Sequence, residues 1–381
     1  MINSFYFVII YIAILFLLSA FLIKKALNSF EEYGYCGRSL SIGFVLFTYL
    51  GTWIGGGTII GLVSRSYEFG ASQYWIIAMS CIVELFFALL FIGKIRKLGL
   101  KSITGFFAMH YPDFGGVVRI PAAAALLIRN VTMIAMQFSA LSYLITFVFG
   151  INRNLALLLV FLVVIVYTVL SGLWGVAVTD VFPLVITMMM LVMITYLGVF
   201  QRVISGGMED SGSVLYSFIF NMENSWWMIL ILVGLIAAIM SSADSFLLAS
   251  GVLISEDIIK RFIIRDADDR EMIFFTRIFI VVTGAIAFAF AININDILYL
   301  WLTGIGMTSV ILVPGYFMGW LDRGVSTRGA LAGMAAGWIY VLMIALGIIK
   351  AGAVQICIGI GLNLIISILF SALQTKSSMQ L

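Results

Sequence analysis

The chain consists largely of long apolar runs separated by short polar stretches. The first run, SFYFVIIYIAILFLLSAFLI at residues 4–23, contains no charged residue. A helix of about 20 apolar residues spans the hydrocarbon core of a bilayer, where each backbone N–H and C=O must be paired within its own helix. A chain that is 63% hydrophobic and 10% charged is too apolar for a water-soluble domain. Because the alternating pattern of a membrane β-barrel is not visible, the sequence predicts an all-α polytopic membrane protein.

We expect about eleven membrane-spanning helices. Their expected ranges are 4–23, 42–64, 74–93, 120–148, 155–174, 180–200, 225–251, 277–293, 297–318, 329–349 and 352–372. The first range has no Lys or Arg before it and no clear cleavage site, so we expect a retained span rather than a signal peptide. The longest polar stretch, SEDIIKRFIIRDADDREM, is expected to form a short surface helix and a connector. The sequence predicts one integral membrane domain over residues 1–381 and no separate soluble domain.

Positive charge is divided unevenly between the two sides of the expected membrane. The stretches 24–41, 94–119, 175–179, 252–277 and 319–328 and the C-terminal tail hold 16 of the 21 Lys and Arg residues. The stretches on the other side hold 4, and Arg129 lies within a span. Since cytoplasmic loops carry the excess of Lys and Arg, we expect a multi-pass cell-membrane protein with its N-terminus outside and its C-terminus in the cytoplasm.

The sequence lacks residues that several functional classes of protein need. The three cysteines, Cys36, Cys81 and Cys357, have no disulfide or metal-site spacing, and His110 is the only histidine. The sequence contains no Gly-rich phosphate-binding loop with GK[ST], so it gives no indication of ATP hydrolysis. An intramembrane protease is a further alternative, but neither membrane aspartate sits in a Gly-x-Gly-Asp setting and no serine has a helical His partner. We therefore expect no enzyme, no organic cofactor and no nucleic-acid partner.

One expected span contains an unusual density of glycine. The stretch LGTWIGGGTIIG, residues 50–61, has glycines at 51, 55, 56, 57 and 61. Glycine lowers helix propensity and permits torsions that other residues avoid, so this helix can unwind in mid-membrane and free its carbonyl groups. Transporters use such broken helices to bind ions and solutes. The alternative is that these glycines only allow neighbouring helices to pack closely.

Ionisable residues within spans are costly and usually face an interior or a water-filled path. This chain has four candidates, Glu84, Arg129, Asp180 and Asp244. Glu84 and Arg129 could pair with each other across two spans. This structural role and a functional role are both open for the two residues.

A second polar feature lies in the stretch AAIMSSADSFLLAS. Ala238, Ser241, Ser242 and Ser245 are spaced by three and four residues, so they share one helical face. Such serines can bond back to their own helix or allow close packing. Alternatively, adjacent hydroxyls and a freed carbonyl supply hard oxygen ligands for a small cation. The glycine-rich span favours the cation site.

These stretches resemble the sodium/solute symporter family. The similar motifs are FTYLGTWIGGGTIIGLVSRSYEFG, SGLWGVAVTDVFP, AAIMSSADSFLLAS followed by EDIIKRF, and LYLWLTGIG with RGALAGMAAGW. They occur in the family's order and cover most of the chain, and the Trp-x-Gly-Gly-Gly form is most similar to the choline-transporter branch. The resemblance implies two inverted repeats of five helices, with one repeat incomplete here, and sodium bound between the first broken helix and the serine helix.

The resemblance also implies individual site residues. Its sodium ligands would be the carbonyl oxygens of Gly51, Ile54 and Ala238 and the hydroxyl groups of Ser241 and Ser242. Asp180 and Ser245 would serve a second cation or proton position.

The implied substrate residues are Trp53, Gly55, Gly56, Gly57 and Thr58. In choline-type members the tryptophan helps form an aromatic cage, which attracts a quaternary ammonium group by cation–π interaction.

The chain departs from the family pattern between Asp180 and Ser241. The family has two more helices there, whereas the 201–224 stretch of this chain is too short for two crossings. Ile82 and Met133 stand where choline-type members carry further cage aromatics, so choline itself is not the favoured solute.

We therefore expect a symporter that couples sodium entry to uptake of a small polar or ionic organic solute. Its partners would be sodium, the solute, the lipid bilayer and a chain that supplies the missing helices. The alternative is a shortened relative that does not transport and acts as a membrane sensor or a subunit.

Overall fold

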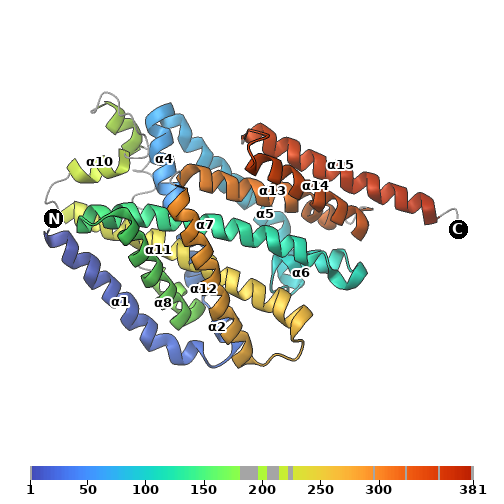
Figure 1. Ribbon diagram of the computed structural model, residues 1–381, viewed down its shortest axis with the longest axis horizontal. Coiled ribbons are helices and arrows are strands. Elements are labelled where there is room, and N and C mark those ends of the chain that lie inside the picture. Colours follow the sequence, from blue (N-terminus) through green and yellow to red (C-terminus); the bar gives the residue numbers. More distant parts are fainter. Residues whose placement is uncertain are drawn as a thin grey trace. The chain divides into compact units, whose positions relative to one another are not determined.

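The computed structural model describes residues 2–180, 196–203, 214–221, 226–294, 297–321, 324–350 and 352–378, and all regular secondary structure in these ranges is helical (Figure 1). The longer helices are α1 (Ile2–Ala26), α3 (Ile42–Trp53), α4 (Gly56–Phe69), α5 (Tyr74–Lys97), α7 (Arg119–Phe149), α8 (Arg153–Thr179), α11 (Trp226–Ile254), α12 (Asp269–Asn293), α13 (Ile297–Leu321), α14 (Thr327–Ala345) and α15 (Ala353–Ser378). The short elements are α2 (Phe30–Tyr35), η1 (Cys36–Arg38), η2 (Ala71–Gln73), α6 (Ile103–His110), η3 (Asp113–Gly116), α10 (Val214–Asn221) and η5 (Ser255–Ile263).

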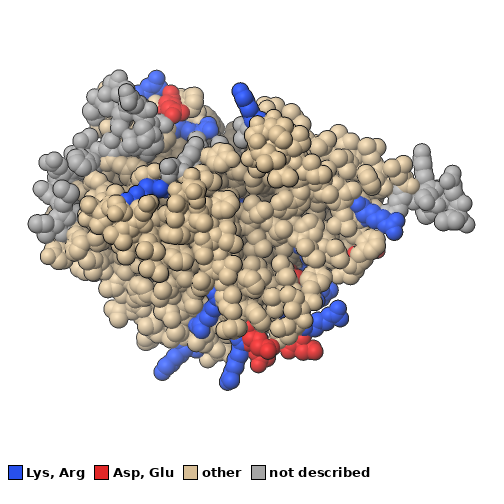
Figure 2. Space-filling model, viewed as in Figure 1, with Lys and Arg blue, Asp and Glu red and all other residues tan. Residues whose placement is uncertain are grey.

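The long helices agree with the expected membrane spans. Within the described ranges, 9 helices are long and apolar enough to cross a membrane, and α3 with α4 forms a further bent crossing. These crossings match ten of the eleven expected spans in order. The remaining span, 180–200, lies mostly outside the described residues, as does most of the 201–224 stretch. Uncharged residues cover most of the face shown in Figure 2, as a surface in contact with hydrocarbon requires.

The chain divides into two compact units. The first unit comprises Met1–Ile92, Met133–Val252 and Ala267–Leu300, and the second comprises Gly93–Thr132, Leu253–Asp266 and Trp301–Leu381. Each unit combines segments that are distant in the sequence. That the whole chain acts as one membrane domain stays a prediction.

In the first unit α8 packs against α1 and α12, and α2 is fastened to a kink in α8. Gly172 has the torsions φ 53° and ψ −150°, which interrupt the helix and strongly favour glycine. In an unbroken helix the N–H of residue 173 would bond to the Val169 carbonyl. That carbonyl instead accepts from the Tyr33 hydroxyl at 2.8 Å and from Arg277 Nε at 3.0 Å. The kink therefore supplies the acceptor that holds α2 in place.

In the second unit α13, α14 and α15 are joined by polar contacts inside an apolar bundle. Pro314 lies within α13 and has no N–H, so the Val310 carbonyl loses its helical partner. Asn363 of α15 donates from Nδ2 to this carbonyl at 2.8 Å. A Cβ added at Gly333 of α14 would lie 2.0 Å from the Ser367 hydroxyl, so glycine is needed for this close approach.

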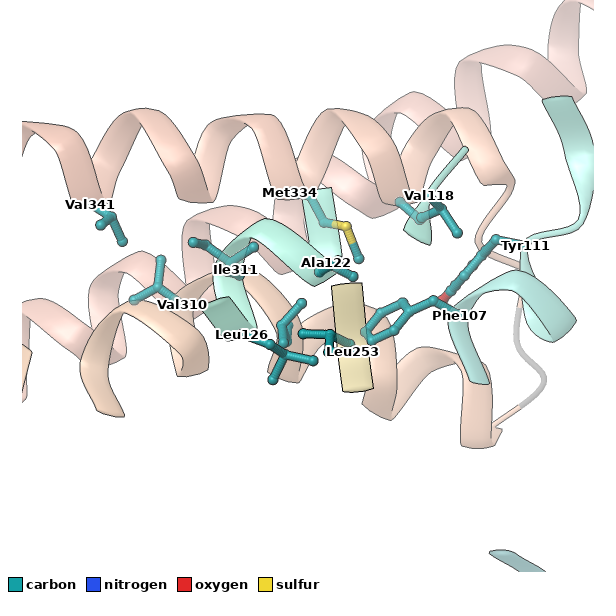
Figure 3. Close-up of a cluster of buried hydrophobic side chains, with 14 of the residues drawn as sticks. Phe107, Tyr111, Val118, Ala122, Leu126, Leu253, Val310, Ile311, Met334 and Val341 are labelled. Atoms are coloured by element: carbon teal, nitrogen blue, oxygen red, sulfur yellow. The ribbon is translucent and has the colours of Figure 1, made fainter. Parts of the chain in front are cut away.

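The second unit also has a continuous apolar core (Figure 3). Phe107 and Tyr111 of the α6 region meet Leu126 of α7, and Val310 and Met334 contribute from α13 and α14. The Tyr111 hydroxyl donates to the Gly315 carbonyl at 2.8 Å, so its polar end is paired inside the core.

Candidate functional site

The second crossing is broken at the glycine-rich stretch, as expected. Helix α3 ends at Trp53, α4 begins at Gly56, and the two are bent by 52°. Ile54, with φ −95° and ψ 86°, and Gly55, with φ −120° and ψ −170°, are both outside the helical region. The carbonyl groups of the last turn of α3 are therefore released from regular helical hydrogen bonding.

The glycines at the break provide space rather than unusual torsions. None of the glycines at 51, 55, 56, 57 and 61 has a positive φ. A Cβ added at Gly55 would lie 2.4 Å from Gln137 Nε2 and 2.7 Å from Ser242 Oγ. At Gly51 it would lie 2.6 Å from Ser241 Oγ. The sequence argument from torsional freedom predicted the break, but close approach of α7 and α11 is the physical reason for glycine at positions 51 and 55.

The serine helix α11 faces this break. Ser242 Oγ is buried and lies 2.9 Å from the Gly51 carbonyl oxygen, 3.4 Å from that of Ile54 and 3.2 Å from that of Ala238. The Thr52 carbonyl oxygen is 3.3 Å away. A hydroxyl group carries a single proton, so it can donate to only one of these four acceptors at a time. Carbonyl groups from the end of α3, from the break and from α11 therefore converge on one hydroxyl group.

The neighbouring serines extend this set of oxygen atoms. Ser241 donates to Asp180 Oδ1 at 2.5 Å, and Ser245 Oγ accepts from the Thr52 hydroxyl at 2.9 Å. Asp180 is the C-cap of α8 and has no exposed surface. Its second oxygen has no hydrogen-bond partner in the part of the chain that the structure describes. A buried carboxylate with an unpaired oxygen favours a positive charge beside it.

Gln137 is a member of the site that the sequence argument did not identify. Its side chain projects from α7, and Oε1 accepts from the Gly56 backbone N–H at 2.7 Å. That N–H lies at the start of α4, where the helix itself supplies no acceptor. The available signal was a lone glutamine in the middle of the expected span 120–148, which is a polar residue that needs a partner.

Asp244 has a hydrogen-bond partner, Tyr167, that the sequence argument also did not identify. Its carboxylate accepts from the Tyr167 hydroxyl of α8, and both side chains are buried. Ser241, Asp244 and Asp180 thus bring hydroxyl and carboxylate groups of α11 and α8 together.

The implied substrate residues lie at the break, and Glu84 lies beside them. Trp53 donates from Nε1 to Glu84 Oε1 at 3.0 Å, and the Tyr49 hydroxyl donates to Glu84 Oε2. Thr58 Oγ1 donates to the Trp53 carbonyl at 3.0 Å. Gly55, Gly56 and Gly57, which lie between Trp53 and Thr58 in the sequence, are buried. Because Arg129 belongs to the second unit, its pairing with Glu84 stays a prediction.

Relatives of the chain are membrane transporters. It is 23% identical to the human high affinity choline transporter 1, over 79% of this chain and 68% of that protein. It is 27% identical to a sodium/proline symporter of Staphylococcus aureus, over 49% of this chain and 37% of that protein.

Comparison with solved structures identifies the fold. A Na⁺-coupled sialic acid symporter in a substrate-bound, outward-open state superposes with a TM-score of 0.74 at 15% identity. The match covers 97% of this chain and 98% of that chain, which confirms the predicted class of helical transporter fold. The sequence model of the Sodium:solute symporter family matches residues 33–213 and 181–337. These ranges cover most of the 381 residues, and the chain belongs to the sodium:solute symporter family.

Proposed function

We propose that the chain couples sodium entry to uptake of a small polar or ionic organic solute. The observation that carries this proposal is the convergence of the Gly51, Ile54 and Ala238 carbonyl groups on the Ser242 hydroxyl. Sodium would bind there, with the Ser241 hydroxyl as a further ligand. Carbonyl and hydroxyl oxygens are the hard, weakly polarisable donors that suit a small alkali cation. A cation would contact several of these oxygens at once, whereas the Ser242 proton bonds to one of them at a time.

A second cation or proton would lie near Asp180 and Ser245. The buried Asp180 carboxyl group lies next to the proposed sodium site and would carry its negative charge when a cation is bound beside it, and its unpaired oxygen supports a role as a ligand. Ser245 would contribute its hydroxyl group from the same helix as Ser241 and Ser242.

The solute would bind beside the break, against Trp53, Gly55, Gly56, Gly57 and Thr58. The Trp53 ring is held at its N–H edge by Glu84. The face of a tryptophan ring attracts a cationic group, which suits this solute class. Because the break connects the ring with the proposed sodium ligands over a few residues, an ion that orders the break also orders the solute site. The two affinities would then rise together, since coupling between sites is reciprocal.

The driving force would be the sodium gradient across the cell membrane. One charge moved through 100 mV of membrane potential contributes about 2.3 kcal/mol. The proposed orientation has the N-terminus outside and the C-terminus in the cytoplasm, supported by the 16 against 4 division of Lys and Arg.

A second candidate function follows from the short segment between Asp180 and Ser241. The alignment with the human choline transporter has 402 positions, more than the 381 residues of this chain, so it contains gaps in this chain. If the gaps remove two helices, a partner chain would supply them, or the protein would be a membrane sensor or subunit that binds sodium without transport.

Uptake into reconstituted vesicles tests the proposal. Radiolabelled choline, proline and sialic acid would be offered with and without an inward sodium gradient. We expect the gradient to raise the uptake of at least one solute from the panel, extended to other small polar solutes. Uptake that is indifferent to sodium would contradict symport. Sodium binding with no uptake of any solute would favour the sensor or subunit.

A further inference from the structure

The second unit contains a charged cavity that is separate from the ion and solute residues. Its volume is about 660 Å³, within the range of small-molecule sites. It is lined by Gly99, Leu100, Lys101, Ser102, Gly105, Gly115, Arg119 and, from η5 and the residues after it, Glu256, Asp257, Lys260, Arg261, Phe262 and Arg265. Five of these side chains are cationic and two are acidic, so the lining has a surplus of positive charge.

The two acidic side chains are already engaged with two of the cations. Asp257 has no exposed surface, and its Oδ1 accepts from Arg119 Nη1 at 2.8 Å and from Ser102 Oγ at 3.0 Å. Glu256 Oε1 lies 3.9 Å from Lys101 Nζ. The Asp257 contacts join three segments of the chain that line the cavity.

Three cations remain for a ligand. Lys260, Arg261 and Arg265 line the cavity, and none of them makes an ion pair with a described residue. Lys260 is half-buried, and the two arginines are exposed. Arg119 Nε is buried and has no hydrogen-bond partner among the residues that the structure covers. Cations held close together repel one another, so this cavity favours an anion with several acceptor oxygens, as a phosphate group has.

Exposed apolar residues next in sequence to the lining residues favour a lipid over a free anion. Leu98, Ile103 and Ile263 adjoin the lining residues in sequence, and their exposed fractions are 36%, 50% and 64%. The stretches 94–119 and 252–277, which supply the cavity, hold five Lys and Arg residues each and lie on the side predicted to be cytoplasmic. Basic pockets at the cytoplasmic ends of membrane helices suit anionic headgroups, and adjacent apolar surface suits acyl chains.

We propose that this cavity binds the phosphate group of an anionic membrane phospholipid, with Lys260, Arg261 and Arg265 as its main contacts. The site is independent of the proposed transport activity. It is on η5, which continues α11 beyond the serines, so a bound lipid would hold the end of the serine helix at the membrane surface.

The test uses the full chain, purified in an uncharged detergent, and measures binding of short-chain phosphatidylglycerol. The pocket variant is Arg261→Gln with Arg265→Gln. The control variant is Arg96→Gln with Lys97→Gln, which removes the same charge from exposed cations outside the cavity lining. Arg119 is left intact, because its loss would leave the buried Asp257 carboxylate without its ion-pair partner and could unfold the protein.

We expect the pocket variant to bind phosphatidylglycerol at least about tenfold more weakly than the native chain and the control variant. Phosphatidylcholine, which carries no net charge, should bind weakly to all three. Equal binding by the pocket and control variants would overturn the proposal. Inorganic phosphate that binds as tightly as phosphatidylglycerol would also overturn it, since the ligand would then be a free anion. Melting temperatures without lipid show that both variants are folded.

Discussion

Ser242 Oγ lies 2.9 Å from the carbonyl oxygen of Gly51, although 191 positions separate the two residues in the sequence. The contact joins the end of α3, where the helix breaks, to the middle of the serine helix. It is the shortest of the four distances from this hydroxyl to carbonyl oxygens. The following predictions start from this contact.

Replacing Ser242 by alanine should weaken sodium binding by about tenfold or more, because it removes one oxygen ligand from a site with few ligands. Binding of radiolabelled sodium to the purified protein measures the effect. The matched control is Ser309→Ala, whose hydroxyl group bonds back to Ile305 within α13 at 2.9 Å. If Ser242→Ala and Ser309→Ala bind sodium equally well, the proposed site is wrong.

Replacing Gly55 by alanine should weaken sodium binding and slow transport, and its effect on the expression level should be smaller. The new Cβ would push against Ser242 Oγ and the Gln137 amide, and the short serine side chain has little freedom to move away. Gly361→Ala is the control, because a Cβ there has no neighbour within 4 Å. A Gly55→Ala protein with native sodium affinity would show that the break tolerates a wider separation from α11.

Gln137→Leu should destabilise the protein, because the buried Gly56 N–H would lose the acceptor that the glutamine provides. An unpaired buried donor costs about 1–3 kcal/mol. Gln137→Glu keeps an acceptor at this position and should recover part of the loss. Thermal unfolding of the detergent-solubilised protein compares the three forms. Equal melting temperatures for the leucine variant and the native chain would contradict this role.

Asp180→Asn should weaken sodium binding and abolish sodium-driven uptake while preserving the shape of the side chain. The amide oxygen can still accept from Ser241, so the main change is the loss of a buried negative charge. Asp113→Asn makes the same chemical change at an exposed position of η3 and should have no effect. Sodium titrations of both variants at constant ionic strength provide the measurement. Native sodium affinity in Asp180→Asn would remove Asp180 from the proposed cation sites.

Cys36 should resist alkylation at neutral pH. Burial, reinforced by Glu32 and opposed by Lys25, raises the pKa of this thiol from 9.0 to about 12. The reactive thiolate is therefore scarce at pH 7 and increases only as the pH approaches 12. The test uses a variant in which Cys81 and Cys357 are replaced, so that Cys36 is the remaining cysteine. Mass spectrometry should find little modification of it by N-ethylmaleimide before unfolding and full modification afterwards. Rapid modification of the folded protein at pH 7 would mean that the Cys36 thiol is not buried.

Features written in a short stretch of sequence could be predicted. Apolar runs gave the positions of ten crossings, because each span is specified by its own residues. The glycine cluster indicated the break at Ile54, and the serine spacing indicated the face that meets it.

Features that depend on a distant partner could not be predicted. The bond from Gly56 to Gln137 joins residues 81 positions apart, and neither residue carries a local pattern that names the other. The same holds for the Tyr167 hydroxyl that meets Asp244 across 77 positions. A polar residue within a span reveals that it needs a partner, whereas the identity of the partner depends on how the helices pack.

The long separation between Gly51 and Ser242 also has a consequence for biogenesis. A ribosome adds about 5–20 residues per second, so roughly 10–40 s pass between the synthesis of Gly51 and that of Ser242. During that interval the released carbonyl groups at the end of α3 lack the Ser242 hydroxyl. In the nascent chain the break between α3 and α4 therefore has no contact with the serine helix until residue 242 has been made.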